Sequence, residues 1–314
     1  MFGQTPLTTE VIAADAAGIT RAIAALRAGE PVALPTETVY GLAASAADAL
    51  AVARVYAAQG RPSFNPLIVH VADIAAAEQL VEVSPTARAL MERFWPGPLT
   101  LVLPLRPGVA VAALVTAGLP TLAVRCPAHP VMRAVIAATG PLAAPSANTS
   151  GRLSATRAAH VLASLQGRIG LILDGGPCAA GVESTIVAVD GERVALLRPG
   201  AVAAEQLGIN AKASGEITAP GQLASHYAPR QPLRLDVTGA HPDEFHIGFG
   251  DTAGDVNLSA SSDLVEAAAQ LFDVLHIAEV SGRTGIAVAP IPNYDLGAAI
   301  NDRLRRAAAP RPNG

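Results

Sequence analysis

The sequence is poor in cysteine, aromatic residues and charged residues. Its 314 residues include only two cysteines, Cys126 and Cys178, with no CxxC pair and no Cys/His spacing typical of zinc. We therefore expect two packed, reduced thiols rather than a disulfide. Aromatic residues make up 4% of the chain and the formal net charge is −4, which argues against base-stacking rows and a broad basic surface for nucleic acid. A local arginine cluster in a cleft is compatible with this charge.

Long apolar runs are also missing. The best stretch, residues 109–124, contains Thr116, Gly118 and Pro120, so we expect no membrane span. The N-terminal segment MFGQTPLTTEV has no basic segment followed by an apolar core, and we expect no signal peptide. The prediction is a cytoplasmic protein with no membrane partner.

The patterning of the first two thirds of the chain predicts an α/β fold. The 25 prolines and 28 glycines imply many punctuated turns, and strand-like runs alternate with helix-like runs. This alternation predicts a twisted, mixed sheet covered by helices. The expected strands are residues 32–34, 67–71, 99–103, 121–125, 142–144, 169–173, 184–189 and 194–198. The expected helices are residues 46–58, 85–94 behind a Ser84 cap, 129–138 and 154–165.

The pattern loosens from about residue 208. Residues 209–231 are small, polar and rich in Pro and Gly, which predicts an interdomain linker, and we expect it to fold over the cleft as a lid. A smaller α/β domain is expected at 232–309, acting as a scaffold, with strands 244–249 and 286–289 and helices 262–275 and 296–308. The expected organisation is a catalytic domain at 1–208, the linker, this second domain and a frayed tail at 310–314.

Four motifs share one chemistry. They are PTETVYGL (35–42), QGRPSFNPLIVH (59–70), TLAVRCP (121–127) and PSANTSGR (145–152). Each ends an apolar run and presents hydroxyl, amide or guanidinium groups on backbone broken by Pro or Gly. None carries a Ser–His–Asp set or a metal-ligand cluster, and the chain has no GxxxxGK[ST] phosphate loop. This chemistry predicts a site that positions anions and small zwitterions and supplies no nucleophile of its own.

Charged candidates occur at the ends of the expected strands. Arg125 ends one strand, and its guanidinium could hold a carboxylate or a phosphate at the edge where α/β sheets bind ligands. Taken alone, a structural arginine paired with Asp or Glu is the more common interpretation. Arg198 could hold a second phosphate. Glu37, Asp174 and Glu183 are candidate magnesium ligands or general bases, although no spacing requires it.

The polar candidates are ambiguous one by one. His70 after a strand is more often a core histidine than a ligand, and Asn65 before Pro66 could simply form a turn. Residues 145–152 suit phosphate or ribose contacts, but they could equally be a polar loop leading to a helix capped by Ser154.

Taken in order, the motifs resemble the YrdC-like domain of threonylcarbamoyl-AMP synthases. PTETVYGL, QGRPSFNPLIVH, WPGPLT (95–100), PSAN (145–148), STIV (184–187) and RPG (198–200) occur in the family's order. HYAP (226–229) and YDLGAAINDRLRRAA (294–308) look like the longer, two-domain form of the family. Six ordered motifs are far more specific than any one of them.

The resemblance implies that L-threonine, bicarbonate and ATP with magnesium give threonylcarbamoyl-AMP and pyrophosphate. A separate transferase would then use the product to modify the adenosine beside the anticodon of tRNA. The threonine site implied by the motifs comprises Thr36, Thr38, His70, Arg125, Ser146 and Ser184. The implied ATP site comprises Arg61, Asn65, Thr121, Asn148, Ser154, Arg198 and Tyr227. No residue acts as a nucleophile, magnesium is expected mainly on the ATP phosphates, and no stable nucleic-acid binding is expected.

One position departs from the family pattern. The family usually has Lys before Gly-Arg, and this chain has Gln59 there, so a cation near the phosphates is lost. Two alternatives therefore stay open: an RNA-binding module, and a carbamoyltransferase with a different acceptor.

Overall fold

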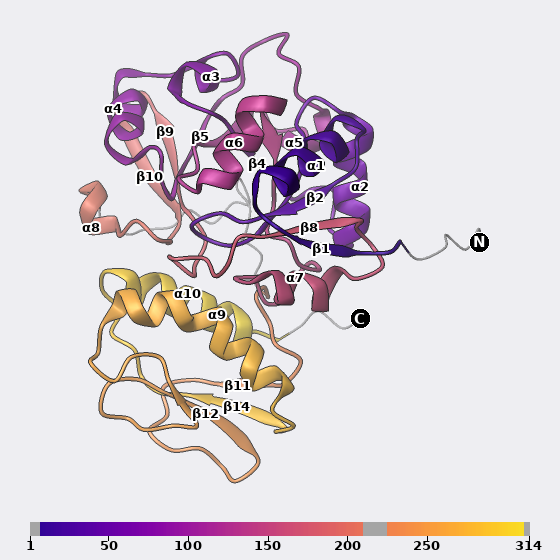
Figure 1. Cartoon of the computed structure of the whole chain (residues 1–314). Coiled ribbons are helices and arrows are strands. Elements are labelled where there is room, and N and C mark those ends of the chain that lie inside the picture. Colours follow the sequence, from indigo (N-terminus) through magenta and orange to yellow (C-terminus); the bar gives the residue numbers. More distant parts are fainter. Residues whose placement is uncertain (1–6, 210–224, 311–314) are drawn as a thin grey trace.

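The computed structural model describes residues 7–209 and 225–310, which form two β-sheets with their helices (Figure 1). Residues up to 209 build a ten-stranded mixed sheet in the order β1-β8-β2-β3-β7-β4-β6-β5-β9-β10. Its strands are β1 (Glu10–Ala13), β2 (Val32–Leu34), β3 (Gly41–Ser45), β4 (Ile68–His70), β5 (Leu99–Pro104), β6 (Thr121–Arg125), β7 (Leu142–Ala143), β8 (Leu171–Asp174), β9 (Thr185–Asp190) and β10 (Arg193–Arg198). The predicted α/β class with a mixed sheet is confirmed.

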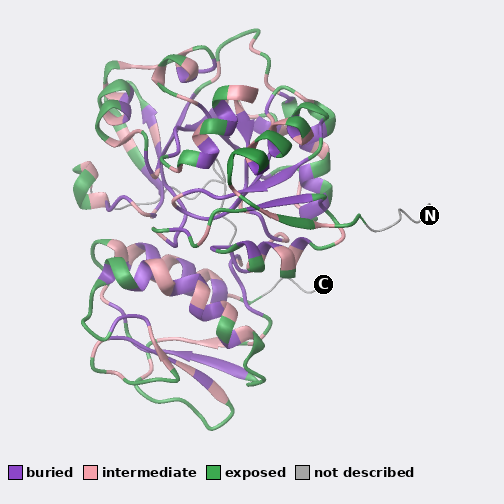
Figure 2. Cartoon of the chain, viewed as in Figure 1, coloured by how far each residue is buried: buried purple, intermediate pink, exposed green. Residues whose placement is uncertain are grey.

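The central strands are buried along their length (Figure 2). Short runs such as VAL in β2 and IVH in β4 have no polar alternation, as expected for strands covered on both faces. β4 pairs with β6 in parallel, with His70 opposite Arg125, and β5 pairs with β6 in antiparallel. This register brings the polar ends of two distant motifs side by side.

The helices begin where the sequence supplies an acceptor for exposed N–H groups. Asp48 accepts from the backbone at the start of α2, and Ser84 does so before Pro85 at the first position of α4. The helices of this part are α1 (Ala16–Arg27), α2 (Ala49–Gln59), α3 (Ile74–Glu78), α4 (Pro85–Phe94), α5 (Ala113–Thr116), α6 (Pro130–Thr139), α7 (Ala158–Leu165) and α8 (Ala204–Leu207). None of the helices in the described ranges is long and apolar enough to cross a membrane.

Two parts of the fold differ from the sequence expectation. The expected helix at 154–165 begins only at Ala158, because the Ser154 hydroxyl donates to the Glu183 carboxylate instead of capping a helix. The last two residues of PTETVYGL, Gly41 and Leu42, already belong to β3, a strand that was not predicted and that pairs in antiparallel with β2. β1 and α1 were not predicted at all.

The second part of the chain forms a parallel sheet in the order β11-β14-β12-β13. Its strands are β11 (Leu233–Arg234), β12 (Glu244–Gly248), β13 (Val256–Asn257) and β14 (Gly285–Val288), and its helices are α9 (Leu264–Val280) and α10 (Leu296–Ala308). Both helices lie between this sheet and the ten-stranded sheet (Figure 1). The two helices therefore form the side of this unit that meets the rest of the chain.

The contact between the two units is close and has an apolar centre. The apolar cluster around α9 also contains Val39, Leu153 and Val182 from the first unit. Gly181 has φ of 68°, and a Cβ atom there would lie 2.4 Å from the backbone of α9 at Ala269. Only glycine fits so close an approach. Residues 210–224, most of the predicted lid at 209–231, lie outside the described residues, as do 311–314 of the predicted tail.

Candidate functional site

A cavity with about 50 Å³ of space accessible to water lies over one face of the central strands of the ten-stranded sheet. Ile68 and His70 both line it, and residues two apart on a strand point to the same face. The site therefore covers a face of the sheet and does not sit only at the carboxyl ends of strands, where the sequence analysis placed it. The lining residues are Thr36, Thr38, Val39, Gly41, Arg61, Ile68, His70, Arg125, Ala144, Pro145, Ser146, Glu183, Ser184, Arg198, His226 and Tyr227.

All six residues of the implied threonine site line this cavity. They come from four separate parts of the sheet: the β2–β3 connection, the end of β4 and β6, the segment after β7 and the start of β9. From the implied ATP site, Arg61, Arg198 and Tyr227 line the same cavity. The structure thus gathers nine of the proposed residues, although their individual roles are not decided by position alone.

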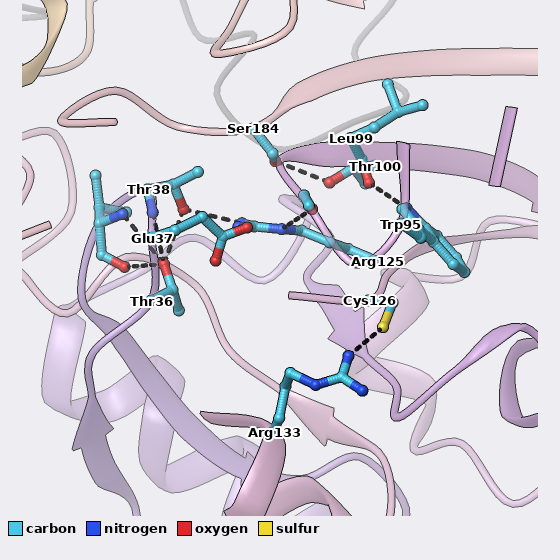
Figure 3. A network of polar contacts seen from close by, with 12 residues as sticks. Thr36, Glu37, Thr38, Trp95, Leu99, Thr100, Arg125, Cys126, Arg133 and Ser184 are labelled. Atoms are coloured by element: carbon cyan, nitrogen blue, oxygen red, sulfur yellow. Dashed lines mark hydrogen bonds and ion pairs between the residues drawn. The ribbon is translucent and has the colours of Figure 1, made fainter. Parts of the chain in front are cut away.

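Arg125 is held rigidly on the cavity wall (Figure 3). Its Nε donates to the Gly97 carbonyl at 3.2 Å, its Nη1 to Thr38 Oγ1 at 2.9 Å and its Nη2 to Glu37 Oε1 at 2.6 Å. A guanidinium has five N–H donors, so these contacts leave one N–H on each terminal nitrogen. The side chain is paired with a carboxylate, as the structural interpretation expected, and can still present two parallel donors to a ligand.

Glu37 orients Arg125 from the β2–β3 connection. Burial by itself raises the pKa of this carboxyl, but the neighbouring Arg125 guanidinium outweighs it and holds the pKa below its usual value. In the same turn, the Thr36 hydroxyl donates to the Val39 carbonyl at 2.6 Å, and the Thr36 and Thr38 hydroxyl oxygens lie 2.8 Å apart. Glu37 is therefore an ionised partner of Arg125, which fixes the guanidinium plane.

Two histidines in the cavity wall are neutral. Burial, with Arg125 close by, lowers the pKa of His70 to about 3. Burial likewise lowers the pKa of His226 to about 3, and Arg61 and Arg198 add to the effect. The Nδ1 atoms of both rings and the Tyr227 hydroxyl are buried without a hydrogen-bond partner among the described residues. Since buried polar atoms are nearly always paired, these three atoms around one cavity are available to pair with a bound molecule.

The arginines of the implied ATP site differ in their partners. Arg61 donates only to the backbone carbonyls of Asn65 and Pro66, and within the described residues no carboxylate lies at salt-bridge distance from it. Burial lowers its pKa to about 10, which keeps it charged at neutral pH. Arg198 donates to the Ser184 carbonyl at 2.8 Å and to its hydroxyl at 3.2 Å. Within residues 7–209 and 225–310, Arg61 is thus a cation without a local counter-ion, as expected for an anion site.

The RPG turn brings Arg198 close to Ser184. A Cβ atom at Gly200 would lie 2.4 Å from the Glu183 carbonyl oxygen, so only glycine permits this approach of the two segments. The Ser184 hydroxyl also meets the hydroxyl of Thr100 at 2.8 Å. Glycine is therefore needed at position 200, where the backbone of the RPG turn contacts the backbone at Glu183.

Four residues of the implied ATP site do not line the cavity. Asn65 is buried beside it, with both side-chain polar atoms unpaired among the described residues, and Asn148 donates to the carbonyls of Thr149 and Arg152. The Ser154 hydroxyl donates a hydrogen bond to the Glu183 carboxylate. Thr121 begins β6, on the same face as Arg125 but about 13 Å along the strand at 3.3 Å per residue.

Gln59 supports the cavity wall from behind. Its amide nitrogen donates to the Ser146 carbonyl, and its backbone carbonyl accepts from the Ser150 N–H at 2.8 Å. Its side-chain oxygen is buried and has no partner among the described residues. The residue that replaces the family's lysine therefore shapes the PSAN segment without adding a charge.

The three carboxylates considered as magnesium ligands have other partners. Glu37 is paired with Arg125 and Glu183 with Arg303, while Asp174 accepts from the Gly176 N–H at 2.9 Å. Among residues 7–209 and 225–310, no three His, Cys, Asp or Glu side chains gather as a metal site. Glu37 and Glu183 thus balance arginines, and Asp174 accepts from the backbone. Cys126 and Cys178 are free and buried, as predicted.

Sequence reasoning missed three residues at this site: Thr100, His226 and Arg303. Thr100 and His226 lay inside the quoted motifs WPGPLT and HYAP, but were given no role. Arg303 comes from α10 and is completely buried. Its spacing could have revealed it, because positions 300, 303, 304 and 307 form one buried stripe and a charged residue on such a stripe needs a partner.

Comparisons with known proteins agree with this arrangement. A family model described as telomere recombination matches residues 24–200, and one described as the threonylcarbamoyl-AMP synthase C-terminal domain matches residues 192–309. The chain is 40% identical to threonylcarbamoyl-AMP synthase of Bacillus subtilis, with 96% of each chain covered. It is 37% identical to that of Pyrococcus abyssi, with 91% of this chain and 92% of the relative covered.

A solved structure extends the likeness to three dimensions. The crystal structure of P. abyssi Sua5 complexed with L-threonine superposes with a TM-score of 0.84 at 34% identity, covering 96% of this chain and 97% of that one. Two family models, full-length relatives and a full-length structural match agree, and we conclude that this chain belongs to the threonylcarbamoyl-AMP synthase family, in its two-domain form.

Proposed function

We propose that this protein makes threonylcarbamoyl-AMP and pyrophosphate from L-threonine, bicarbonate and ATP, and so serves the threonylcarbamoyladenosine modification of tRNA. The observation that carries the proposal is a cavity lined both by Arg125, which has two N–H groups to spare, and by Arg61, which has no carboxylate partner among the described residues. One arginine suits the carboxylate of an amino acid, and the other suits a phosphate.

The chemistry needs no protein nucleophile. The threonine amine attacks bicarbonate to form an N-carboxylate, with loss of water. An oxygen of this carbamate then attacks the α-phosphorus of ATP, a phosphorus–oxygen bond breaks, and pyrophosphate leaves with the electron pair. The protein has to align the two reactants, and alignment alone can supply about 7–11 kcal/mol of barrier reduction in favourable cases.

We assign the threonine carboxylate to Arg125 and the hydroxyls of Thr36, Thr38, Ser146 and Ser184. His70, being neutral, would accept or donate one hydrogen bond without adding charge. These assignments are supported by the common cavity and by the orphaned His70 nitrogen.

We assign the ATP side to Arg61, Arg198 and Tyr227, with Asn65, Asn148 and Ser154 shaping its wall. An extended nucleotide lying along the face of β6 could reach Thr121. Magnesium would enter as the ATP complex, held by the phosphates, since the nearby carboxylates already balance arginines.

We also propose the division of labour between the units. Residues up to about 208 carry the substrates, and 232–309 form a smaller domain that packs against them. A separate transferase would use the product. We place this protein in the cytoplasm. The lid predicted at 209–231 falls mostly outside the described residues and stays a prediction.

The test is mass spectrometry of the protein incubated with ATP, magnesium, bicarbonate and L-threonine, each omitted in turn. The expected result is a threonylcarbamoyl-AMP mass that disappears with any omission, together with pyrophosphate in equal amount. Product formation from another amino acid or from carbamoyl phosphate would support a different carbamoyl transfer. Salt-sensitive RNA retention without pyrophosphate would instead support an RNA-binding module.

A further inference from the structure

Arg303 links the second unit directly to the wall of the cavity. It lies on α10, has no exposed surface, and its Nε donates to Glu183 Oε2 at 2.9 Å. Its guanidinium carbon lies 5.3 Å from the centre of the Tyr227 ring. Both Glu183 and Tyr227 line the cavity, whereas Arg303 itself does not.

The same helix holds the segment that carries Tyr227. The His226 N–H donates to the Arg306 carbonyl at 3.2 Å, and the rings of His226 and Tyr227 meet edge to face at 4.1 Å. Arg303 Nη1 also donates to the Pro199 carbonyl, next to Arg198. One buried side chain thus contacts three parts of the proposed ATP side: Glu183, Tyr227 and the RPG turn.

The negative charge of Glu183 would weaken ATP binding in this cavity if it were not balanced. Glu183 is a carboxylate in the wall of a site that must hold several phosphate charges, and like charges in a buried site repel strongly. Its other oxygen accepts from the Ser154 hydroxyl, so the residue also organises the wall. Its charge has to be balanced locally, and Arg303 is placed to do so.

We propose that Arg303 is a positioning residue of the ATP site: it neutralises Glu183 and holds the Tyr227 ring, so that the second unit completes the nucleotide pocket. This inference rests on the proposed function. It gives the second unit a role in ATP binding, beyond that of a scaffold. The threonine side, built around Arg125 and Glu37, does not depend on it.

Several charged and titratable groups surround Glu183 and bear on its protonation. Arg303 and Asp302 face it from α10, Arg198 from β10, and His226 and Tyr227 from the segment before β11. Burial alone would raise the pKa of Glu183, and Arg303 together with Arg198 holds it below its usual value. Removing Arg303 therefore raises this pKa, and a lower pH then removes the unwanted charge.

The experiment measures KM for ATP and for threonine separately, in the full-length protein. In Arg303→Met we expect KM for ATP to rise about tenfold, a change equivalent to about 1.4 kcal/mol, while KM for threonine changes less than about twofold. The defect should shrink, relative to wild type, as the pH falls from about 8 to about 6, because Glu183 becomes protonated. Arg303→Lys should restore part of the ATP affinity.

Two further variants separate electrostatics from folding. Arg303→Met/Glu183→Gln removes both charges, and its KM for ATP should return towards the wild-type value and lose the extra pH dependence. Arg305→Met changes an exposed arginine of the same helix and should leave both KM values unchanged. Thermal unfolding of each variant shows whether it is folded under the assay conditions.

Three outcomes would overturn the inference. They are an unchanged KM for ATP in folded Arg303→Met, an equal loss for both substrates, and a failure of Glu183→Gln to rescue a folded double variant. A wild-type protein that makes no threonylcarbamoyl-AMP would instead refute the proposed function, so the two failures can be told apart.

Discussion

The two units of this protein treat buried polar groups in opposite ways. In the described residues, 18 polar or charged side chains are buried, and only Ser259 and Arg303 lie after residue 233. The ten-stranded unit buries arginines, hydroxyls and neutral histidines around one cavity. The four-stranded unit buries an apolar core of leucine, phenylalanine and alanine between its sheet and two helices.

The two units therefore differ in how their buried side chains contribute to the free energy of unfolding. Buried polar groups without partners cost free energy, and three of them lie around the cavity, one on β4 and two on the segment before β11. The second unit has few such costs and offers a dry, rigid support. Its one buried charge in the helices, Arg303, faces the first unit and not its own core.

The largest effect that would test this comparison is the loss of Arg125. In Arg125→Ala we expect threonine-dependent turnover to fall by about a thousandfold or more, because preorganised charge at a reacting site is worth several kcal/mol. The measurement is threonylcarbamoyl-AMP formation by mass spectrometry. Near-normal turnover would remove Arg125 from the site.

A matched control is needed because Arg125→Ala leaves the partly buried Glu37 carboxylate without its partner. Breaking such a pair typically costs about 3–5 kcal/mol of stability. Arg125→Ala/Glu37→Gln should therefore recover stability in thermal unfolding while remaining inactive. Recovery of activity in this double variant would contradict the assignment.

A substitution in the core of the second unit should lower the stability of the protein without changing KM for threonine. Leu275→Ala removes a completely buried side chain from α9 and should lower the free energy of unfolding by about 2–5 kcal/mol. At a temperature where the variant is folded, KM for threonine should not change. Ile277→Ala, at an exposed position on the same helix, should cost less than about 0.5 kcal/mol. A changed threonine KM in folded Leu275→Ala would break the comparison.

Acid should destabilise the polar cavity. An unfolded histidine, with a pKa of 6.5, takes up a proton as the pH falls below that value, whereas buried His70 does so only near 3. The unfolded state then binds more protons, so stability is complete above about pH 6.5 and declines by up to about 1.4 kcal/mol per pH unit for each such histidine as the pH falls.

Urea unfolding between about pH 7.5 and about pH 5.5 measures this decline. In His70→Gln the slope of stability against pH should become smaller, even if the variant is less stable at neutral pH. His226 contributes in the same direction. An unchanged slope in the variant would mean that His70 is not neutral in the folded protein.

Tyr227→Phe tests the contact between the two units. The hydroxyl is buried without a partner among the described residues, so its removal should leave stability equal or slightly higher. KM for ATP should rise about fivefold, since one hydrogen bond to the ligand is lost. Tyr56→Phe is the contrast, because that hydroxyl lies 2.8 Å from two backbone carbonyls, donates its one proton to one of them, and its loss should cost about 1 kcal/mol of stability. A loss of stability in Tyr227→Phe would contradict an unpaired hydroxyl.

The smallest expected effect concerns Gln59. In Gln59→Lys the ammonium can replace the hydrogen bond to the Ser146 carbonyl and adds a charge near the proposed phosphates. KM for ATP should fall about two- to threefold, as for a partly screened charge. Gln59→Leu should raise it, because the PSAN segment loses its support. Equal values in both variants would show that position 59 does not affect the nucleotide.

Some elements followed directly from the sequence. α4 begins at Pro85 after the Ser84 cap, and β6 has the predicted bounds, because capping residues and uninterrupted apolar runs act locally. α10 also has the predicted bounds, which follow from the helical spacing of its apolar residues. β3 was missed because GLAAS follows a turn and has little strand propensity. It exists because β2 and β7 pair with its two edges.

The sequence predicted the candidate site only in part. The ordered motifs named the residues that gather on one face of the sheet, but not Arg303 or His226. Ser154 was expected to cap a helix, and it instead donates to a carboxylate 29 positions later. The contact between Ser154 and Glu183 leaves no local pattern in the chain, whereas Arg303 is marked only as a charged residue on a buried stripe.

The sequence by itself determined the chemical inventory of this protein: hydroxyls, amides and guanidinium groups at the ends of apolar runs, and two helices with buried stripes. Local rules suffice there, because caps, turns and strand periods involve neighbouring residues. Only the tertiary structure decided which charges meet. Strand pairing placed His70 opposite Arg125, and packing of the two units brought Arg303 to Glu183, 120 positions apart. Such pairings depend on long-range packing, which fixes distances that no short segment encodes.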